Sequence, residues 1–174
     1  MKKLTLILFL ITSFLILNSP CIAQTKQRKI PSVKVKTLDG KTFDTGTLSN
    51  KGNPMIISFW ATWCKPCIRE LTNIADVYED WQEETGVKLI AVSIDNTRST
   101  AKVGPFVNGK GWDYEFYLDP NGDFKRALGV NMIPHTFLVN GKNEIVWQRT
   151  TYTEGEEEEL FELIKKTAAG EMVK

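Results

Sequence analysis

Two runs of mainly apolar residues predict the central strands of the fold. Residues 55–60 read Met-Ile-Ile-Ser-Phe-Trp and do not alternate between apolar and polar positions. A strand with one wet face would alternate, so we expect this strand to be buried on both faces. Residues 87–94 read Val-Lys-Leu-Ile-Ala-Val-Ser-Ile and predict a second buried strand.

Other segments show helical or hairpin periodicity. From Cys67 to Trp81, apolar residues recur every three or four positions, which predicts one amphipathic helix that ends at Gly86. Residues 156–168 repeat this spacing and predict a last helix. In contrast, residues 33–43 alternate around an Asp-Gly turn, so they predict a β-hairpin.

The remaining elements are shorter. They comprise a helix over 99–108, a strand over 114–118, a turn over 119–122, a helix over 123–128, and a hairpin of strands 136–139 and 145–149. Strands that alternate with helices, followed by a hairpin and a closing helix, are typical of an α/β fold with helices on both faces of one sheet.

The N-terminal residues have the layout of a secretory signal peptide. Met1-Lys2-Lys3 is followed by an apolar run to Leu17, and Cys21-Ile22-Ala23 precedes a candidate cleavage point. The run is shorter than the roughly 20 residues that span a membrane, although an uncleaved anchor remains an alternative. We therefore expect a signal peptide over 1–23, a tether over 24–29 and one domain over 30–174.

The net charge and the cysteine positions narrow the range of possible functions. The 174 residues carry a net charge of +1, which gives no indication of binding to nucleic acid. Removal of residues 1–23 also removes Cys21, which leaves Cys64 and Cys67 as the only cysteines. An exported chain that keeps one closely spaced pair and no other cysteine is expected to use it for chemistry.

The Cys64-Lys-Pro-Cys67 motif lies between a predicted strand and a predicted helix. The unpaired N–H groups and the positive dipole end of a helix N-terminus favour a thiolate, which is the nucleophile of disulfide exchange. A structural zinc site is the alternative, but it needs four ligands and the rest of the chain supplies few.

Three segments resemble the thioredoxin superfamily, and within it the secreted thiol–disulfide oxidoreductases such as TlpA and ResA. They are Phe-Trp-Ala-Thr-Trp-Cys-Lys-Pro-Cys at 59–67, Arg-Glu-Leu at 69–71 and Ile-Pro-His-Thr-Phe-Leu-Val at 133–139. The resemblance covers residues 30–168. It implies a thioredoxin-like mixed β-sheet flanked by helices, with an added N-terminal β-hairpin, and it implies no cofactor and no metal.

The two cysteines are expected to have different roles. Cys64 is nearer the free end of the helix and should attack the substrate disulfide, after which Cys67 resolves the mixed disulfide. Lys65 adds a positive charge near the thiolate, and Pro66 fits the first helical turn, where no N–H is needed. Trp63 should flank the nucleophile and contact substrate.

Proton transfer at the buried sulfur needs an acceptor. Thioredoxin has an aspartate six residues before its first cysteine, whereas this chain has Ser58 there. The TlpA- and ResA-like proteins instead use a glutamate one turn beyond the second cysteine, which corresponds to Glu70. We expect Glu70 to accept the proton of Cys67, the alternative being a surface glutamate favoured by the helix dipole.

The resemblance also places a cis-proline loop at Ile133-Pro134, facing the cysteine pair. The backbone of Ile133 could then pair with an extended substrate segment. His135 is the only histidine, and it either tunes the thiolate or packs against the sheet.

These features predict an exported protein-disulfide reductase of the periplasm that acts on substrate protein disulfides. Such reductants serve cytochrome c maturation in this family, and a membrane thiol reductant supplies their electrons through transient contact. Two alternatives remain: a thiol oxidase or isomerase of the same fold, and a copper-handling module that uses Cys64, Cys67 and His135.

Overall fold

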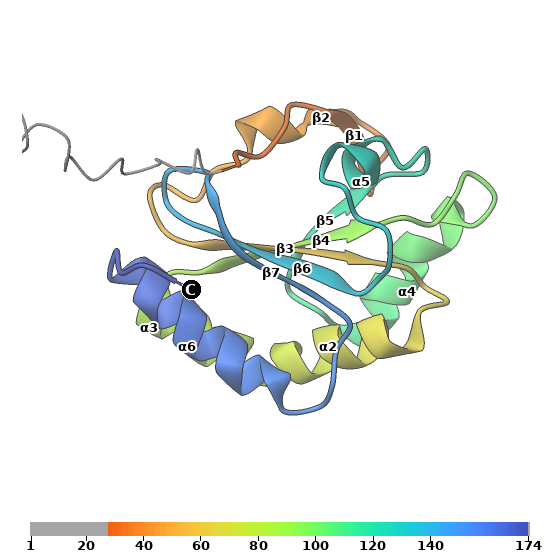
Figure 1. Cartoon of the computed structure of the whole chain (residues 1–174). Helices are drawn as coiled ribbons and strands as arrows, with labels where there is room; N and C mark the ends of the chain where they lie inside the picture. The colour runs from red at the N-terminus through yellow and green to blue at the C-terminus, as the bar shows by residue number, and fades with distance from the viewer. Residues whose placement is uncertain (1–27, 174) are drawn as a thin grey trace, which may run out of the picture.

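The computed structural model describes residues 28–173 (Figure 1). In chain order, the strands and α-helices of these residues are β1 (Lys34–Thr37), β2 (Thr42–Asp44), β3 (Met55–Trp60), α2 (Lys65–Ala75), α3 (Tyr78–Thr85), β4 (Lys88–Ser93), α4 (Val103–Lys110), β5 (Glu115–Leu118), α5 (Asp123–Ala127), β6 (His135–Val139), β7 (Ile145–Thr150) and α6 (Glu156–Ala168). Short 3-10 helices lie at Thr45–Thr47 and Thr100–Lys102.

All seven strands form one mixed sheet in the order β2-β1-β5-β4-β3-β6-β7. β4 pairs in parallel with both β3 and β5, and the other neighbouring strands pair antiparallel. The predicted N-terminal hairpin is present and extends the sheet beyond β5, because β1 pairs with β5 as well as with β2. The predicted α/β fold is confirmed.

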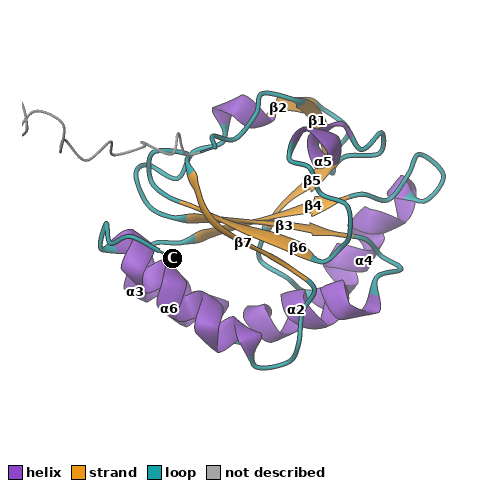
Figure 2. Cartoon of the chain, in the orientation of Figure 1, coloured by secondary structure: helices purple, strands orange, loops and turns teal. Residues whose placement is uncertain are grey.

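Side chains of β3 divide the core into two layers. Ile56 and Trp60 pack with α2, α3, α4 and α6 on one face of the sheet. Met55, Ile57 and Phe59 pack on the other face with Phe124 of α5. Figure 2 shows these helices below and above the sheet, with the β1–β2 hairpin on the same side as α5. Every residue of β3 is buried, as its continuous apolar pattern predicts.

The prediction of one helix from Cys67 to Gly86 is wrong, because two helices occupy this segment. α2 ends at Ala75, and Val77 has φ −125° and ψ 2°, outside the helical region. The N–H of Val77 bonds to Ile74 O, which tightens the chain at the break. Tyr78 and Trp81 remain buried after it, so the apolar spacing continues although the helix does not.

The helix predicted over 99–108 differs from the observed structure at both ends. The segment predicted as a helix over 99–108 begins with a 3-10 turn and continues as α4 to Lys110. Pro105 is the third residue of α4, where its missing N–H has no intrahelical partner to lose.

The N-terminal part of the chain is described only from Arg28. The predicted signal peptide lies outside the described residues. Arg28, in the predicted tether, already contacts the domain, since its side chain donates a hydrogen bond to Gln148 at 2.9 Å. No helix within residues 28–173 is long and apolar enough to cross a membrane.

Candidate active site

The cysteine pair lies where β3 gives way to α2. Cys64 is the N-cap residue of α2, and its sulfur accepts a hydrogen bond from the N–H of Cys67 at 3.3 Å. The two sulfurs form a disulfide with an S–S distance of 2.01 Å. Cys64 is 6% exposed and Cys67 is fully buried, so only Cys64 presents a surface to an incoming sulfur. The predicted position of the pair at a helix N-terminus is confirmed.

The side chains predicted to surround the pair lie at the surface. Trp63, directly before Cys64, is 64% exposed, and Lys65 and Pro66 are exposed in the first turn of α2. Trp60, in contrast, is fully buried and packs edge-on against Trp112. Trp63 is therefore the aromatic side chain available to a partner beside the disulfide.

Asp95 holds the loop that leads to Cys64, and sequence reasoning did not identify it. Its buried carboxylate accepts hydrogen bonds from the N–H and the hydroxyl of Thr62, both at 2.8 Å, and from the hydroxyl of Ser93 at 2.9 Å. An acidic residue directly after a buried strand was the only signal that could have identified it. The carboxylate fixes the backbone two residues before Cys64.

The Ile133-Pro134 segment lies at the same end of the central strands as Cys64. β6 begins directly after Pro134 and runs antiparallel to β3, with His135 opposite Phe59 near the end of β3. The Ile133–Pro134 peptide bond is cis, as expected, and Pro134 is buried. The fold thus brings together two parts of the site that lie far apart in the sequence.

Glu70 is fully buried, so the alternative of a surface glutamate is wrong. It follows Cys67 by one turn of α2, and both residues face the core. The hydroxyl of Thr136, on β6, donates a hydrogen bond to Glu70 Oε1 at 2.8 Å. The hydroxyl of Ser58, on β3, lies 3.4 Å from Oε2 and donates to it. The carboxyl of Glu70 therefore extends from the helix to the two central strands behind the disulfide.

The environment raises the pKa of Glu70 to about 7. Burial is the main cause, because removal from water penalises the charged carboxylate. The hydrogen bond from Thr136, the positive charge of Arg149 and the hydrogen bond from Ser58 act in the opposite direction and lower the pKa of Glu70. A carboxyl with a pKa near neutrality can both accept and return a proton under physiological conditions.

Arg149 is a second, largely buried charge at this site, and sequence reasoning missed it. It lies on β7 with 12% of its side chain exposed, and its Nη2 is 3.9 Å from Glu70 Oε1. Its other terminal nitrogen, Nη1, faces Glu156 Oε2 at 3.5 Å and Glu159 Oε2 at 3.9 Å. Arg149 therefore connects the buried carboxyl with the start of α6.

His135 packs against the sheet and does not join the cysteines in a ligand cluster. Its ring stacks on Phe137 with a centroid distance of 4.4 Å, and its Nδ1 lies 3.3 Å from the hydroxyl of Thr150. Burial lowers the pKa of His135. Within residues 28–173, no three histidine, cysteine or acidic side chains are grouped as a metal site requires.

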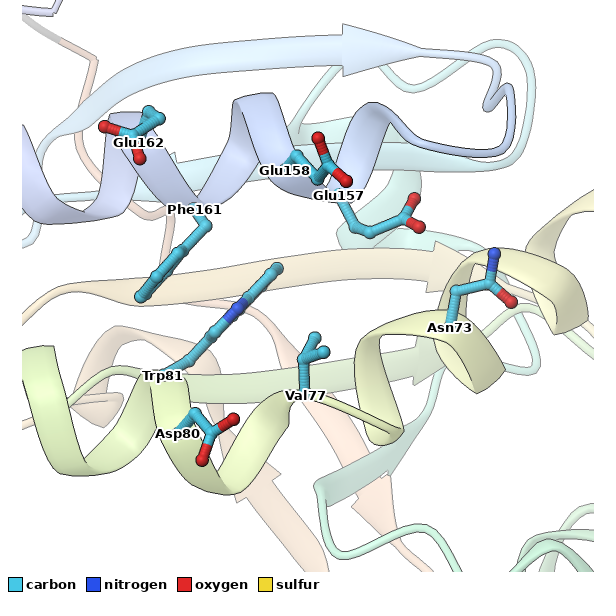
Figure 3. A pocket seen from close by; sticks show the side chains of 8 residues that line it. All are labelled: Asn73, Val77, Asp80, Trp81, Glu157, Glu158, Phe161 and Glu162. Carbon is cyan, nitrogen blue, oxygen red and sulfur yellow. The ribbon is translucent and has the colours of Figure 1, made fainter.

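A groove of about 430 Å³ lies between α3 and α6 (Figure 3). Trp81 and Phe161 stack face to face within it, with their ring centroids 5.1 Å apart. It contains none of the predicted site residues. The groove is therefore a feature of the packing between these two helices and not part of the disulfide site.

Comparisons with known proteins agree with this geometry. Residues 27–148 match the model of the AhpC/TSA family. The sporulation thiol-disulfide oxidoreductase A of Bacillus subtilis is 32% identical over 125 residues, which cover 71% of this chain and 73% of that protein. The thiol-disulfide oxidoreductase ResA of Halalkalibacterium halodurans is 33% identical over 135 residues, covering 77% and 74% of the two chains. An uncharacterized thioredoxin-like protein from Porphyromonas gingivalis has a similar structure, with a TM-score of 0.73, 54% identity, and coverage of 80% of this chain and 92% of that chain.

Proposed function

Since this chain belongs to the AhpC/TSA family of thioredoxin-like proteins and is a thiol–disulfide oxidoreductase of the ResA and StoA type, we propose that it works mainly as a reductant of protein disulfides. The substrates are exported proteins. Cys64 is the attacking thiol, Cys67 the resolving thiol and Glu70 the group that takes the proton of Cys67.

The reaction consists of two thiol–disulfide exchanges. The Cys64 thiolate attacks one sulfur of the substrate disulfide, which forms a mixed disulfide and releases the other substrate sulfur as a thiolate. Glu70 then accepts the proton of Cys67, and the Cys67 thiolate attacks the sulfur of Cys64. The substrate leaves with both of its sulfurs reduced, and the enzyme retains the Cys64–Cys67 disulfide, so two electrons have passed to the substrate.

The observation that carries this proposal is the buried carboxyl of Glu70. A carboxyl at a fully buried position loses its hydration, and it is accommodated here by hydroxyl donors from two strands. Its pKa of about 7 matches a group that exchanges a proton with a thiol near neutral pH. Ser58 occupies the strand position at which thioredoxin has its aspartate, and its contact with Glu70 supports the same role for a carboxyl that comes from the helix instead.

The direction of electron flow is inferred from how little stabilisation a Cys64 thiolate would receive beyond that of the helix N-terminus. Strong oxidants of this chemistry owe their potential to a stabilised reduced form. Among the described residues, Cys64 Sγ accepts one backbone hydrogen bond, and the neighbouring charge of Lys65 is exposed to solvent, which screens it. An ionised Glu70 would also disfavour a second negative charge nearby. These features favour a reducing pair.

The cellular setting is part of the same proposal. Residues 1–23 act as a signal peptide, residues 24–29 begin the exported chain and residues 30–174 form the redox domain. A membrane thiol reductant returns electrons to the Cys64–Cys67 disulfide through transient contact, and cytochrome c maturation is the process that the resemblance indicates. Trp63 and the backbone of Ile133 hold the substrate beside the pair, and Lys65 and Pro66 tune it.

The midpoint potential of the Cys64–Cys67 pair tests the proposed direction of electron flow. Protein that lacks residues 1–23 is equilibrated in dithiothreitol or glutathione buffers, and the oxidised fraction is measured. We expect a value near that of thioredoxin, roughly −270 mV. A value near that of the strong oxidants, roughly −120 mV, would refute the reductant assignment and favour the oxidase alternative.

The role of Glu70 is tested in the same protein. Glu70→Gln should slow the reduction of a substrate disulfide by about 100-fold or more at neutral pH, because general acid–base catalysis contributes roughly 10²- to 10⁴-fold. Glu158→Gln, an exposed change on α6, is the control and should leave the rate unchanged. Equal rates for Glu70→Gln and the native protein would exclude Glu70 as the proton acceptor.

A further inference from the structure

Arg149 has fewer hydrogen bonds than a buried guanidinium needs. Its Nε and Nη2 atoms are buried and donate no hydrogen bond to the described residues. Its Nη1 donates one, to the backbone oxygen of Glu156 at 3.3 Å. The guanidinium lies over the ring of Trp147, with its central carbon 5.4 Å from the ring centroid. A buried cation is costly unless it is paired, so its carboxylate neighbours must stabilise it.

Three carboxylates share this one cation. Nη2 faces Glu70 Oε1 at 3.9 Å on the core side. Nη1 faces Glu156 at 3.5 Å and Glu159 at 3.9 Å on the surface side. The contact with Glu70 is too long for a hydrogen bond, so it acts through charge alone. Attraction to the two surface carboxylates therefore competes with attraction to the buried one.

We propose that Arg149 is a positioning residue for the proton chemistry of Glu70, and that Glu156 and Glu159 set how strongly it acts. This inference rests on the proposed role of Glu70 in thiol exchange. A guanidinium drawn toward Glu70 favours the ionised carboxylate, whereas one drawn toward α6 leaves the carboxyl protonated. The start of α6 thereby controls the protonation state of a group on α2.

The other groups that face Glu70 do not duplicate this control. Thr136 and Ser58 donate neutral hydrogen bonds from β6 and β3. The phenols of Tyr114 and Tyr152 are partly or fully buried, and burial raises the pKa of each well above neutrality, so they carry no charge in the relevant range. The Cys67 thiol precedes Glu70 by one turn on α2, and it does not titrate while the disulfide is intact.

The test is a titration of Glu70 by carboxyl ¹³C NMR in the oxidised protein that lacks residues 1–23, with Glu70→Gln used to assign its signal. Arg149→Gln should raise the pKa of Glu70 by about one unit or more, because an opposite charge at this distance shifts a carboxyl pKa by roughly 1–3 units. Arg149→Lys keeps the charge and should retain most of the native value.

A change on α6 provides a test in the opposite direction that leaves Arg149 in place. The double variant Glu156→Gln, Glu159→Gln removes the competing carboxylates, and with them the direct repulsion between Glu156 and Glu70, so the pKa of Glu70 should fall. The same double change made together with Arg149→Gln should lower this pKa less, because only the direct repulsion is then removed. Glu158→Gln makes the same charge change in the same turn of α6 at an exposed position, and it should leave the pKa of Glu70 unchanged. The double variant is expected to lower the pKa of Glu70, whereas Arg149→Gln is expected to raise it. The inference can therefore be tested even if Arg149→Gln does not fold.

Two results would overturn the inference. One is a pKa of Glu70 that does not respond to Arg149→Gln. The other is a double variant that moves this pKa no more than Glu158→Gln does, since that would indicate a general charge effect. Neither result depends on catalysis, because the titration is measured with the disulfide intact. Failure of the Glu70→Gln rate test would instead remove the role of Glu70 and leave the titration interpretable.

Discussion

The buried carboxyl of Glu70 predicts how the stability of the oxidised protein depends on pH. The pKa of Glu70 rises from 4.5 to about 7 on folding, mainly because of burial. Below pH 4.5 both the folded and the unfolded chain hold the proton. As the pH rises from there to about 7, the unfolded chain releases the proton while the folded chain retains it, so the free energy of unfolding falls.

The size of this change in unfolding free energy follows from the shift in the pKa of Glu70. Each unit of pKa corresponds to about 1.4 kcal/mol, so the shift of Glu70 costs the folded state on the order of 3 kcal/mol above pH 7. Glu70→Gln keeps the shape of the side chain and removes its charge. The variant should therefore lack this loss, and its free energy of unfolding relative to the native protein should increase by about 2.5 kcal/mol between pH 5 and pH 8, since a small part of the loss is already present at pH 5.

The assay is urea unfolding at pH 5 and pH 8 with the disulfide intact, for the native protein, Glu70→Gln and the exposed control Glu158→Gln. The comparison between proteins matters because His135 acts in the opposite direction. Burial lowers the pKa of His135, so its contribution to stability is lost as the pH falls, equally in all three proteins. If Glu70→Gln and the native protein showed the same change in unfolding free energy, Glu70 would not be the buried acid described here.

Two further predictions concern packing, one beside the site and one at the opposite end of β3. Asp95→Ala should cost about 3 kcal/mol of unfolding free energy, because it leaves the buried donors of Thr62 and Ser93 without their acceptor; urea unfolding measures this. Gly141→Ala should destabilise by about 1–3 kcal/mol, because the added Cβ would lie 1.9 Å from the backbone oxygen of Gly52. Its control is Gly109→Ala, an exposed helical position with open space around it, which should stabilise by about 0.5–1 kcal/mol. If Gly141→Ala were as stable as the native protein, the close approach of Gly141 to Gly52 would be contradicted.

Elements whose pattern is local were predictable from the sequence. The buried strand over 55–60 and the last helix over 156–168 match β3 and α6 at both ends. In each case the signal lies within the element, as a continuous apolar run or as helical spacing. The same holds for the cysteine pair, because its chemistry depends on the junction between one strand and the helix that follows it.

The break between α2 and α3 was not predictable from spacing. Tyr78 and Trp81 continue the series of buried positions after the break, because Val77 changes the backbone without turning the apolar face away from the core. Periodicity reports which face is buried, and two helices with a common buried face have the same periodicity as one.

Arg149 was missed because its role depends on contacts with residues from other helices and strands. An arginine on an edge strand is expected to face solvent. β7 is such a strand, but α6 covers its end, and the side chain of Arg149 is held between Glu70 of α2 and Glu156 of α6. No spacing along the chain links these three residues, so only the assembled fold places them together.

The combination of Glu70 and Arg149 is better explained by chemistry than by stability. Apolar side chains of similar volume often replace a buried charged pair with no loss of stability, and sometimes with a gain. The pair here is poorly matched, since its closest approach is 3.9 Å and two donors of Arg149 are unsatisfied within the described residues. Titratable groups with shifted pKa values gather at functional sites. The proposed role of Glu70 gives this arrangement a function: a carboxyl whose pKa is near neutrality lies one turn from Cys67, the sulfur that would exchange a proton with it.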